Sequence, residues 1–176
     1  PAREDLPCPL SSMPCASGTE TGSYWRDVGT LDAYWEASLD LTSVVPELDL
    51  YDPNWRIFTQ GSQLPPAKFV FDDGNRRGMA IDSLVSEGVV VSGSEVRRSL
   101  LSTQARINSY ARLDQAVILP EVNVGRHARL SKVIVDRGVD IPEGLVVGED
   151  PELDARRFER TPGGVCLISR EMITAL

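Results

Sequence analysis

The sequence contains few aromatic residues, one histidine and three cysteines, and each shortage excludes a class of protein. Aromatic side chains make up 6% of the 176 residues, so a core must be built mainly from Val, Leu, Ile and Ala, which favours thin, stacked strands. A single histidine, His127, excludes a three-histidine zinc site. Cys8, Cys15 and Cys166 form no disulfide framework, and Cys166, in the apolar run Gly-Val-Cys-Leu-Ile, is expected to be a buried thiol.

Positive charge and long apolar runs are also scarce. The formal net charge is −8, which disfavours nonspecific binding to nucleic acid or to an anionic membrane. No apolar stretch approaches the roughly 18 residues that cross a bilayer, and no basic segment followed by an apolar one opens the chain. We therefore expect a cytoplasmic protein with no nucleic-acid and no membrane partner. Sixteen of the 18 positive residues are arginine, which suits phosphate recognition but also follows from genomic base composition.

The first 82 residues show little regular periodicity outside one helix. Residues 1–22, rich in Pro, Ser, Gly and Cys, are interpreted as a tail. Thr30 is a suitable N-cap for a helix with Asp32 in its first turn and an apolar face made by Leu31, Tyr34, Trp35 and Leu39. Four prolines then interrupt residues 43–73, which predicts a linker with short strands at "WRIFT" (residues 55–59) and "KFVF" (residues 68–71).

From Ser83 to Gly148, aliphatic residues recur at six-residue intervals. Such a period fits neither an amphipathic helix nor a hairpin, and it is typical of a parallel β-helix, in which each hexapeptide forms one side of a triangular turn. Small residues four positions later are expected at the corners, and Asp136-Arg137-Gly138 is interpreted as a short insertion. The pattern predicts three to four turns with a buried column formed by Ile107, Leu113, Leu119, Val124, Leu130, Ile141 and Val147, and small residues at Ala111, Val117 and Ala128.

The carboxy-terminal segment carries signals for two helices and a strand. Asp150 is an N-cap and Pro151 a first helical residue, for a helix that is expected to end near Phe158 and to cover the last turn. A strand from Val165 to Ile168 and a terminal helix capped by Ser169 follow. The predicted fold is therefore mainly β, a parallel β-helix with a flanking N-terminal helix and linker and with C-terminal capping helices.

Several longer segments are more specific than the repeat. "YWRDVGTLDAYWEASLDL", "PPAKFV", "VILPEVNVGRHARL", "VIVDRGVDIPEGLVVGEDPELDARRF" and "SREM" occur in this order. From about Ser23 to Leu176 the chain resembles bacterial ADP-glucose pyrophosphorylases (glucose-1-phosphate adenylyltransferases), which join ATP and glucose 1-phosphate with Mg²⁺ in glycogen biosynthesis. The resemblance implies a left-handed β-helix that serves allosteric regulation and assembly into a tetramer. It also implies that residues 23–82 come from the end of the catalytic domain and that residues 83–176 are the regulatory and oligomerisation domain.

The resemblance places the family's Gly-rich nucleotide loop and its substrate lysines outside this chain, whose only lysines are Lys68 and Lys132. We expect no catalytic residue and no cofactor here, and no adenylyltransferase activity from the chain alone. Asp27 matches a Mg²⁺ ligand of the family, expected to be weak without the rest of that site. Arg137 and Arg170 match arginines of an effector site for a sugar phosphate or AMP, and the alternative is a pair of solvated arginines.

The sequence contains two further candidate positions and allows two alternative functions. His127 is expected to be an exposed, structural imidazole, although hexapeptide acyltransferases use a histidine base on such a scaffold. Arg76-Arg77-Gly78 is expected to be a solvated loop. The alternatives to a regulatory module are a free-standing hexapeptide acyltransferase and a structural assembly module without a ligand.

Overall fold

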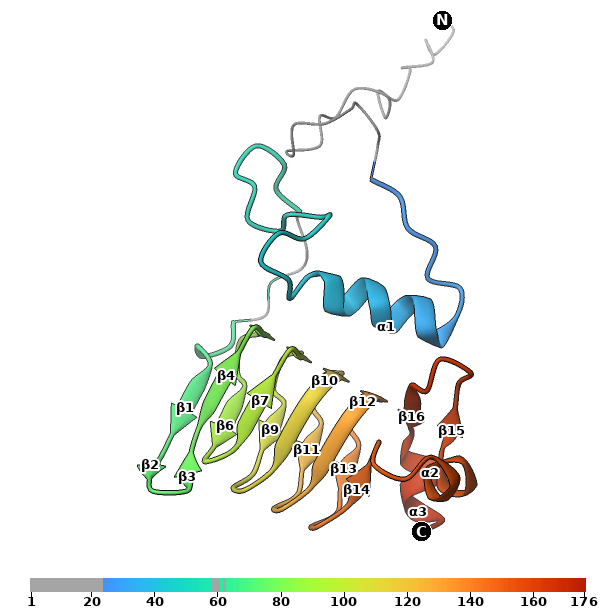
Figure 1. The fold of residues 1–176 in the computed structure, drawn as a ribbon. Coiled ribbons are helices and arrows are strands. Elements are labelled where there is room, and N and C mark those ends of the chain that lie inside the picture. The colour runs from blue at the N-terminus through green and yellow to red at the C-terminus, as the bar shows by residue number, and fades with distance from the viewer. Residues whose placement is uncertain (1–23, 58–60, 62) are drawn as a thin grey trace, which may run out of the picture.

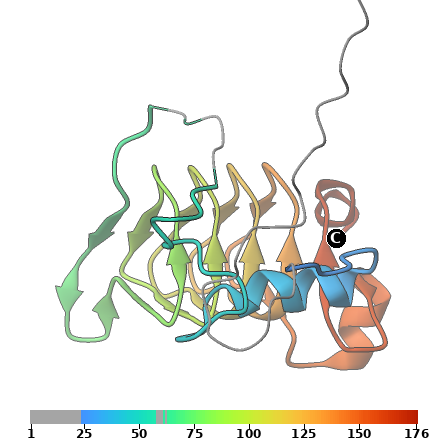
Figure 2. The ribbon, with the colours of Figure 1, turned by 90° about the horizontal axis from the view of Figure 1, so that it is seen from above.

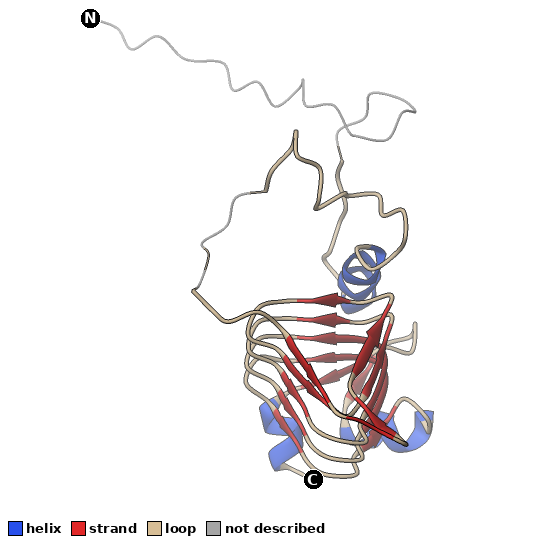
Figure 3. Cartoon of the chain, turned by 90° about the vertical axis from the view of Figure 1, so that its left-hand side faces the viewer, coloured by secondary structure: helices blue, strands red, loops and turns tan. Residues whose placement is uncertain are grey.

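The computed structural model describes residues 24–57, 61 and 63–176, and from Lys68 onward the chain winds into a parallel β-helix (Figure 1). The register pairs Leu113 with Leu130 and Leu130 with Val147, so a turn spans 17 residues there. About four turns stack along the axis, and they wind in the left-handed sense around a triangular cross-section (Figure 3). The predicted β-helix of hexapeptide repeats is confirmed.

Each turn contributes a strand to each of three faces. The first face contains β4 (Met79–Ile81), β7 (Glu95–Arg97), β14 (Val146–Val147) and the first parts of β10 (Arg112–Ile118) and β12 (Arg129–Val135). The second contains β5 (Leu84–Val85), β8 (Leu100–Leu101), the last parts of β10 and β12, and β16 (Cys166–Ile168). The third is a five-stranded sheet of β1 (Lys68–Val70), β6 (Val90–Ser92), β9 (Arg106–Ile107), β11 (Asn123–Val124) and β13 (Asp140–Ile141).

The strands of the β-helix begin at Lys68, before Ser83, where the six-residue repeat begins in the sequence. β1 starts at Lys68 and pairs with β6, and β4 starts at Met79 and pairs with β7. β1 confirms most of the strand predicted at "KFVF". The strand predicted at "WRIFT" is absent from Trp55, Arg56 and Ile57, and the next two residues of that segment lie outside the described ones.

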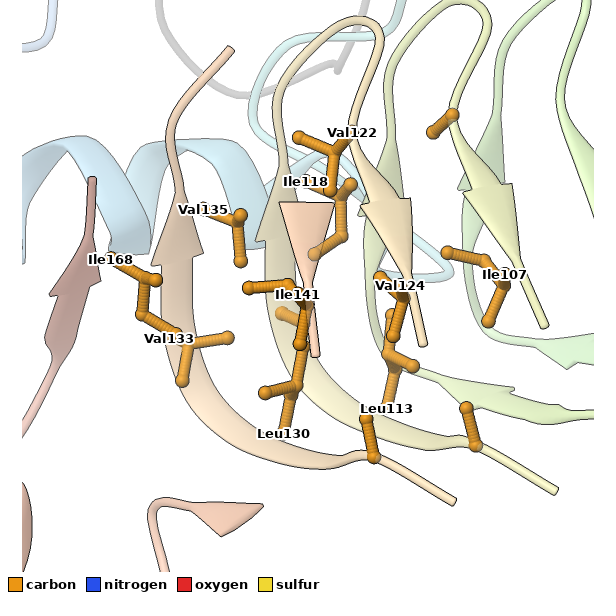
Figure 4. Packing of buried hydrophobic residues seen from close by; sticks show 14 of the residues in the cluster. Ile107, Leu113, Ile118, Val122, Val124, Leu130, Val133, Val135, Ile141 and Ile168 are labelled. Carbon is orange, nitrogen blue, oxygen red and sulfur yellow. The ribbon is translucent and has the colours of Figure 1, made fainter. Parts of the chain in front are cut away.

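The inward side chains form one aliphatic column on each face (Figure 4). Of the predicted column, every residue except Leu119 is at most 2% exposed. Leu119 is only partly buried and packs on the outer surface, while Ile118, with no exposed surface, points inward and pairs in register with Val135. The prediction for Leu119 was wrong because the five-residue interval falls between Leu113 and Ile118, one step earlier than the sequence suggested.

Three corners join the faces, and each contains a column of residues with positive φ. The chain turns from the first to the second face at Asp82, Arg98, Gln115 and Lys132, whose φ values lie between 43° and 54°. Because the backbone turns there within a single residue, β10 and β12 continue around the corner and join the first two faces into one nine-stranded sheet. Val117, expected as a small corner residue, instead lies in β10 with its side chain buried against α1.

Helix α1 (Leu31–Asp40) lies along the second face (Figures 1 and 2). Thr30 caps it as predicted, since its Oγ1 accepts a hydrogen bond from the N–H of Ala33 at 3.1 Å. The predicted apolar face packs on Val117, Ile134 and Val165. The indole N–H of Trp35 also donates to the carbonyl oxygen of Gln115 at 2.8 Å, so the helix is fixed to a corner of the β-helix.

The carboxy-terminal segment closes one end of the prism, as predicted. In α2 (Pro151–Arg157), Asp150 Oδ1 accepts from the N–H groups of Glu152 and Leu153, both at 3.1 Å. β15 (Glu159–Arg160) forms an antiparallel pair with β16, an element that the sequence did not suggest. Helix α3 (Arg170–Thr174), capped by Ser169, follows, and Phe158, Met172 and Ile173 contact the aliphatic core. Cys166 is fully buried, which confirms its prediction.

Two further observations concern the outside of the molecule. A hairpin of β2 (Asp72–Asp73) and β3 (Arg76–Arg77) projects from the N-terminal turn (Figure 1). Among the described residues, no helix has both the length and the apolar character that crossing a membrane requires.

Candidate functional site

The corner between the second and third faces carries the two arginines that the sequence singled out. Asn123 pairs with Asp140 and Val124 with Ile141, so residues 136–139 form a corner of the same length as the one a turn earlier. Asp136-Arg137-Gly138 is therefore an ordinary corner, and its interpretation as an insertion was wrong. Gly138, with φ of 63°, occupies the position that Glu121, with φ of 64°, holds in the preceding turn.

Arg137 projects from this corner and is bound to an acid one turn back. Its Nη2 donates to Oε1 of Glu121 at 2.7 Å, and the side chains are 66% and 48% exposed. This hydrogen bond, reinforced by the negative charge of Glu121, raises the pKa of the Arg137 guanidinium above its ordinary value. The guanidinium keeps donors free for a second acceptor, because one of its five N–H groups serves Glu121.

Arg170 reaches the same corner from the first residue of α3. Its Nη2 donates to the carbonyl oxygen of Gly138 at 2.6 Å. A Cβ at Gly138 would lie 3.0 Å from that nitrogen, so glycine leaves room for the approach. The return of the chain along β16 therefore brings Arg170 to the residue that follows Arg137, although the two lie 33 positions apart in sequence.

Glu121 is the participant that sequence reasoning missed. An acid beside the arginines changes what the corner can do, since an anion must compete with Glu121 for Arg137. The sequence does carry a signal for this ion pair, namely the separation of 16 positions between Glu121 and Arg137. Because a turn spans 17 residues, Glu121 lies in the preceding turn, one position beyond the residue aligned with Arg137. That separation becomes meaningful only once the length of a turn is known.

The remaining sequence candidates lie elsewhere. His127 is exposed, and its ring stacks on Tyr110 with centroids 4.8 Å apart and planes 9° from parallel. His127 is therefore exposed at a corner, as predicted, and its structural role stays a prediction. Arg76 and Arg77 form strand β3 rather than the predicted loop; Arg76 pairs with Asp73 at 3.1 Å, and Arg77 pairs with Asp72.

Comparison with known proteins identifies the family. The profile described as "GlmU-like, C-terminal hexapeptide" matches residues 65–168. The chain belongs to this hexapeptide family. Over 160 residues it is 61% identical to the glucose-1-phosphate adenylyltransferase of Rhodopseudomonas palustris and 59% identical to that of Rhizobium radiobacter, in each case across 91% of this chain. The corresponding protein of Granulibacter bethesdensis is 59% identical over 163 residues.

These relatives extend well beyond the matched region. The chain spans about 38% of the length of the Rhodopseudomonas and Rhizobium proteins and 39% of the Granulibacter protein. It is therefore homologous to the C-terminal part of glucose-1-phosphate adenylyltransferases, as the resemblance predicted.

The magnesium ligand implied by this family, Asp27, can be tested against its surroundings. Asp27 is exposed ahead of α1, and its Oδ1 accepts a hydrogen bond from the N–H of Gly29 at 2.9 Å. Among residues 24–57, 61 and 63–176, no group of three or more His, Cys, Asp and Glu side chains could bind a metal. Mg²⁺ is bound through one or two carboxylates together with substrate phosphates. The surroundings of Asp27 described here do not by themselves fit that ion.

Proposed function

We propose that the chain is the regulatory and oligomerisation part of a glucose-1-phosphate adenylyltransferase, in which Arg137 and Arg170 bind the phosphate of an effector. One observation carries the proposal: Arg170 reaches the carbonyl of Gly138, immediately beside Arg137, at a rigid corner of the β-helix. Two arginines held at one corner suit a phosphate, because each guanidinium can donate two parallel hydrogen bonds to its oxygens. The effector would be a sugar phosphate or AMP.

Glu121 sets the expected strength of this binding. A phosphate that takes donors from Arg137 must displace or share the bond to Glu121, and it approaches a molecule with a net charge of −8. The side chain of Arg137 is also exposed to solvent, where dissolved salt screens its attraction for a phosphate. We therefore expect weak binding by the chain alone, decreasing as ionic strength rises.

The test uses the 176-residue chain and four variants. Fructose 1,6-bisphosphate, fructose 6-phosphate and AMP are titrated by calorimetry at low salt into wild type, Arg137→Ala, Arg170→Ala, Glu121→Gln and Arg156→Ala. The two arginine variants at the corner should lose about tenfold or more in affinity, which corresponds to about 1.4 kcal/mol. Glu121→Gln, which frees Arg137, should bind more tightly, and Arg156→Ala, an exposed arginine of α2, should bind as wild type does.

Equal binding by the wild type and both corner variants would exclude the effector site and leave a structural assembly module as the better description. In that case the hydrogen bonds of Arg137 to Glu121 and of Arg170 to Gly138 serve only to stabilise the fold. Substituting them would then lower the melting temperature without changing any titration.

We also infer that the chain self-associates and has no adenylyltransferase activity of its own. Exposed apolar side chains gather between Trp25 and Ile57, including Trp25 at 81%, Val44 at 92% and Tyr51 at 79% exposure, and such surface favours burial against another molecule. Multi-angle light scattering should report oligomers at micromolar concentration, and a purely monomeric profile would contradict this.

The inferred absence of adenylyltransferase activity is tested by incubating the chain with Mg²⁺, ATP and glucose 1-phosphate. Pyrophosphate release above background would contradict that inference. The cytoplasmic location remains a prediction.

A further inference from the structure

A second basic hollow lies on the first face, at another corner of the prism from Arg137 and Arg170. The β2–β3 hairpin projects over the start of this face (Figures 1 and 2). Beneath it is an open pocket of about 630 Å³, whose lining includes Asn75 of the hairpin, the Tyr110–His127 stack, and Arg77, Arg112 and Arg129. The proposed effector site uses none of these residues.

The register places two of these guanidiniums one turn apart on the same side of the sheet. Arg112 and Arg129 are direct partners in the pairing of β10 with β12. Neighbouring strands lie about 4.8 Å apart, and like charges directly opposite each other are unfavourable. The sheet nevertheless holds both charges at the edge of one hollow.

Acidic side chains compensate only part of this charge. Arg129 pairs with Glu149 at 3.3 Å and Arg77 pairs with Asp72. Glu95 is the register partner of Arg112 on its other side, yet the carboxylate of Glu95 bonds Nε of Arg97 at 2.5 Å. Within residues 24–57, 61 and 63–176, Arg112 therefore forms no ion pair, and its five donors remain available to a ligand.

The other wall of the hollow is stiff and polar at its rim. Tyr110 and His127 occupy successive positions in the corner column, with φ of 66° and 57°, and their stacked rings hold each other in place. The phenol and the imidazole add hydrogen-bonding groups beside the two guanidiniums. Since every element of this wall belongs to a β-helix turn, the spacing of the donors changes little when a ligand enters.

We propose that this hollow binds a phosphate group between the guanidiniums of Arg112 and Arg129. The oxygens of one phosphate group can accept hydrogen bonds from two guanidiniums that lie one turn apart. The negative charge of the phosphate would also reduce the repulsion between the two guanidiniums. Asn75 also lines the hollow and its side-chain amide can bond a hydroxyl group, so the ligand class is a small phosphate ester with a polar remainder. The proposal is independent of the effector role of Arg137 and Arg170.

The test follows the side-chain Nε–Hε signals of the arginines by ¹⁵N NMR while inorganic phosphate is added at constant ionic strength. Arg112→Gln and Arg129→Gln remove one guanidinium each and keep most of the aliphatic stem. Arg106→Gln, an exposed arginine of β9 on the third face, is the matched control for the loss of one positive charge. Arg170→Gln is the control for the other corner.

We expect saturable shifts of the Arg112 and Arg129 signals, with affinity reduced about tenfold in each of their Gln variants and changed less than about twofold in both controls. Glycerol phosphate should bind at least as well as inorganic phosphate. Loss of the same size in Arg106→Gln would show that only net charge attracts the ion, and would overturn the proposal. So would shifts confined to Arg137 and Arg170, which would instead support the effector corner.

Discussion

Ile118 and Leu119 are adjacent residues on opposite sides of the β-helix wall. Ile118 has no exposed surface and belongs to the interior column, whereas Leu119 packs on the outside near α1. Ile118→Ala should therefore lower the free energy of unfolding by about 2–5 kcal/mol, as expected for a cavity in a dense core. Leu119→Ala should cost about 1 kcal/mol, because it loses only part of a contact.

Urea titration monitored by circular dichroism measures both values. The two variants remove similar volumes at neighbouring positions, so each serves as the control for the other. A loss from Leu119→Ala as large as that from Ile118→Ala would contradict the register described here.

Cys166 should be nearly inert toward thiol reagents while the chain is folded. Burial raises the pKa of its thiol, and the nearby charge of Asp154 adds to the shift. A raised pKa leaves less thiolate at any given pH, and the thiolate is the reactive form. The neutral thiol therefore favours the fold below the ordinary pKa of cysteine, and this contribution disappears as the pH rises through the raised value.

Alkylation at pH 8, followed by peptide mass spectrometry, should modify Cys166 rapidly in urea and at least about a hundredfold more slowly in buffer. Repeating the experiment at pH 10 tests the sign of the shift. Fast labelling of Cys166 in buffer at pH 8 would mean that β16 opens readily.

At the scale of elements, α1 is held to the β-helix by polar ties as well as by apolar packing. Asp32 Oδ1 accepts from the hydroxyl of Thr161 at 2.6 Å, and the ammonium of Lys132 lies 5.1 Å from the centre of a ring of Trp35. Trp35 also donates to Gln115. Trp35→Ala removes the contacts of the indole with Lys132 and Gln115 and leaves the bond between Asp32 and Thr161, and it should release α1 while the β-helix stays folded.

Limited chymotrypsin digestion should then cut after Leu31, Tyr34 or Leu39 in Trp35→Ala, with the strand signal in circular dichroism unchanged. Glu36→Ala, at an exposed position of the same helix, is the matched control and should resist as wild type does. Equal resistance of both variants would mean that the remaining apolar contacts suffice.

The sequence predicted the elements that local chemistry specifies. Thr30, Asp150 and Ser169 each cap a helix, because a short polar side chain that binds free N–H groups is a local signal. The aliphatic repeat gave the β-helix because only inward positions must be apolar. The β2–β3 hairpin was missed since its residues are polar throughout and its strands are held by ion pairs that join positions across the turn.

Contacts between turns were beyond the reach of the sequence. The bond between Arg170 and Gly138 depends on where β16 returns, and the bond between Arg137 and Glu121 depends on the length of a turn. Likewise, Arg112 and Arg129 are distant enough in sequence to pass as separate surface residues, although they are register partners. The family resemblance therefore identified Arg137 and Arg170, but the sequence did not show that they contact Glu121 and Gly138.

The whole molecule is asymmetric along its axis. At the carboxy-terminal end, Phe158, Met172 and Ile173 lie against the interior columns. At the other end, β1 and β4 are the last strands of their sheets among the described residues, and β5 pairs with β8 alone. The two ends therefore differ in how much of their backbone and core is covered.

Because each turn bonds only to the turn before and the turn after it, unfolding should proceed like the fraying of a zipper rather than as a single all-or-none event. Native-state hydrogen exchange should be fastest in β1, β4 and β5 and slowest in β10 and β12, whose turns have neighbours on both sides. Phe158→Ala should speed exchange in β14 and β16 and leave β4 unchanged, whereas a uniform increase would indicate a fully cooperative molecule. A ligand that ties adjacent turns together would then slow fraying only from its own turn onward, so the exchange profile would report where along the axis it had bound.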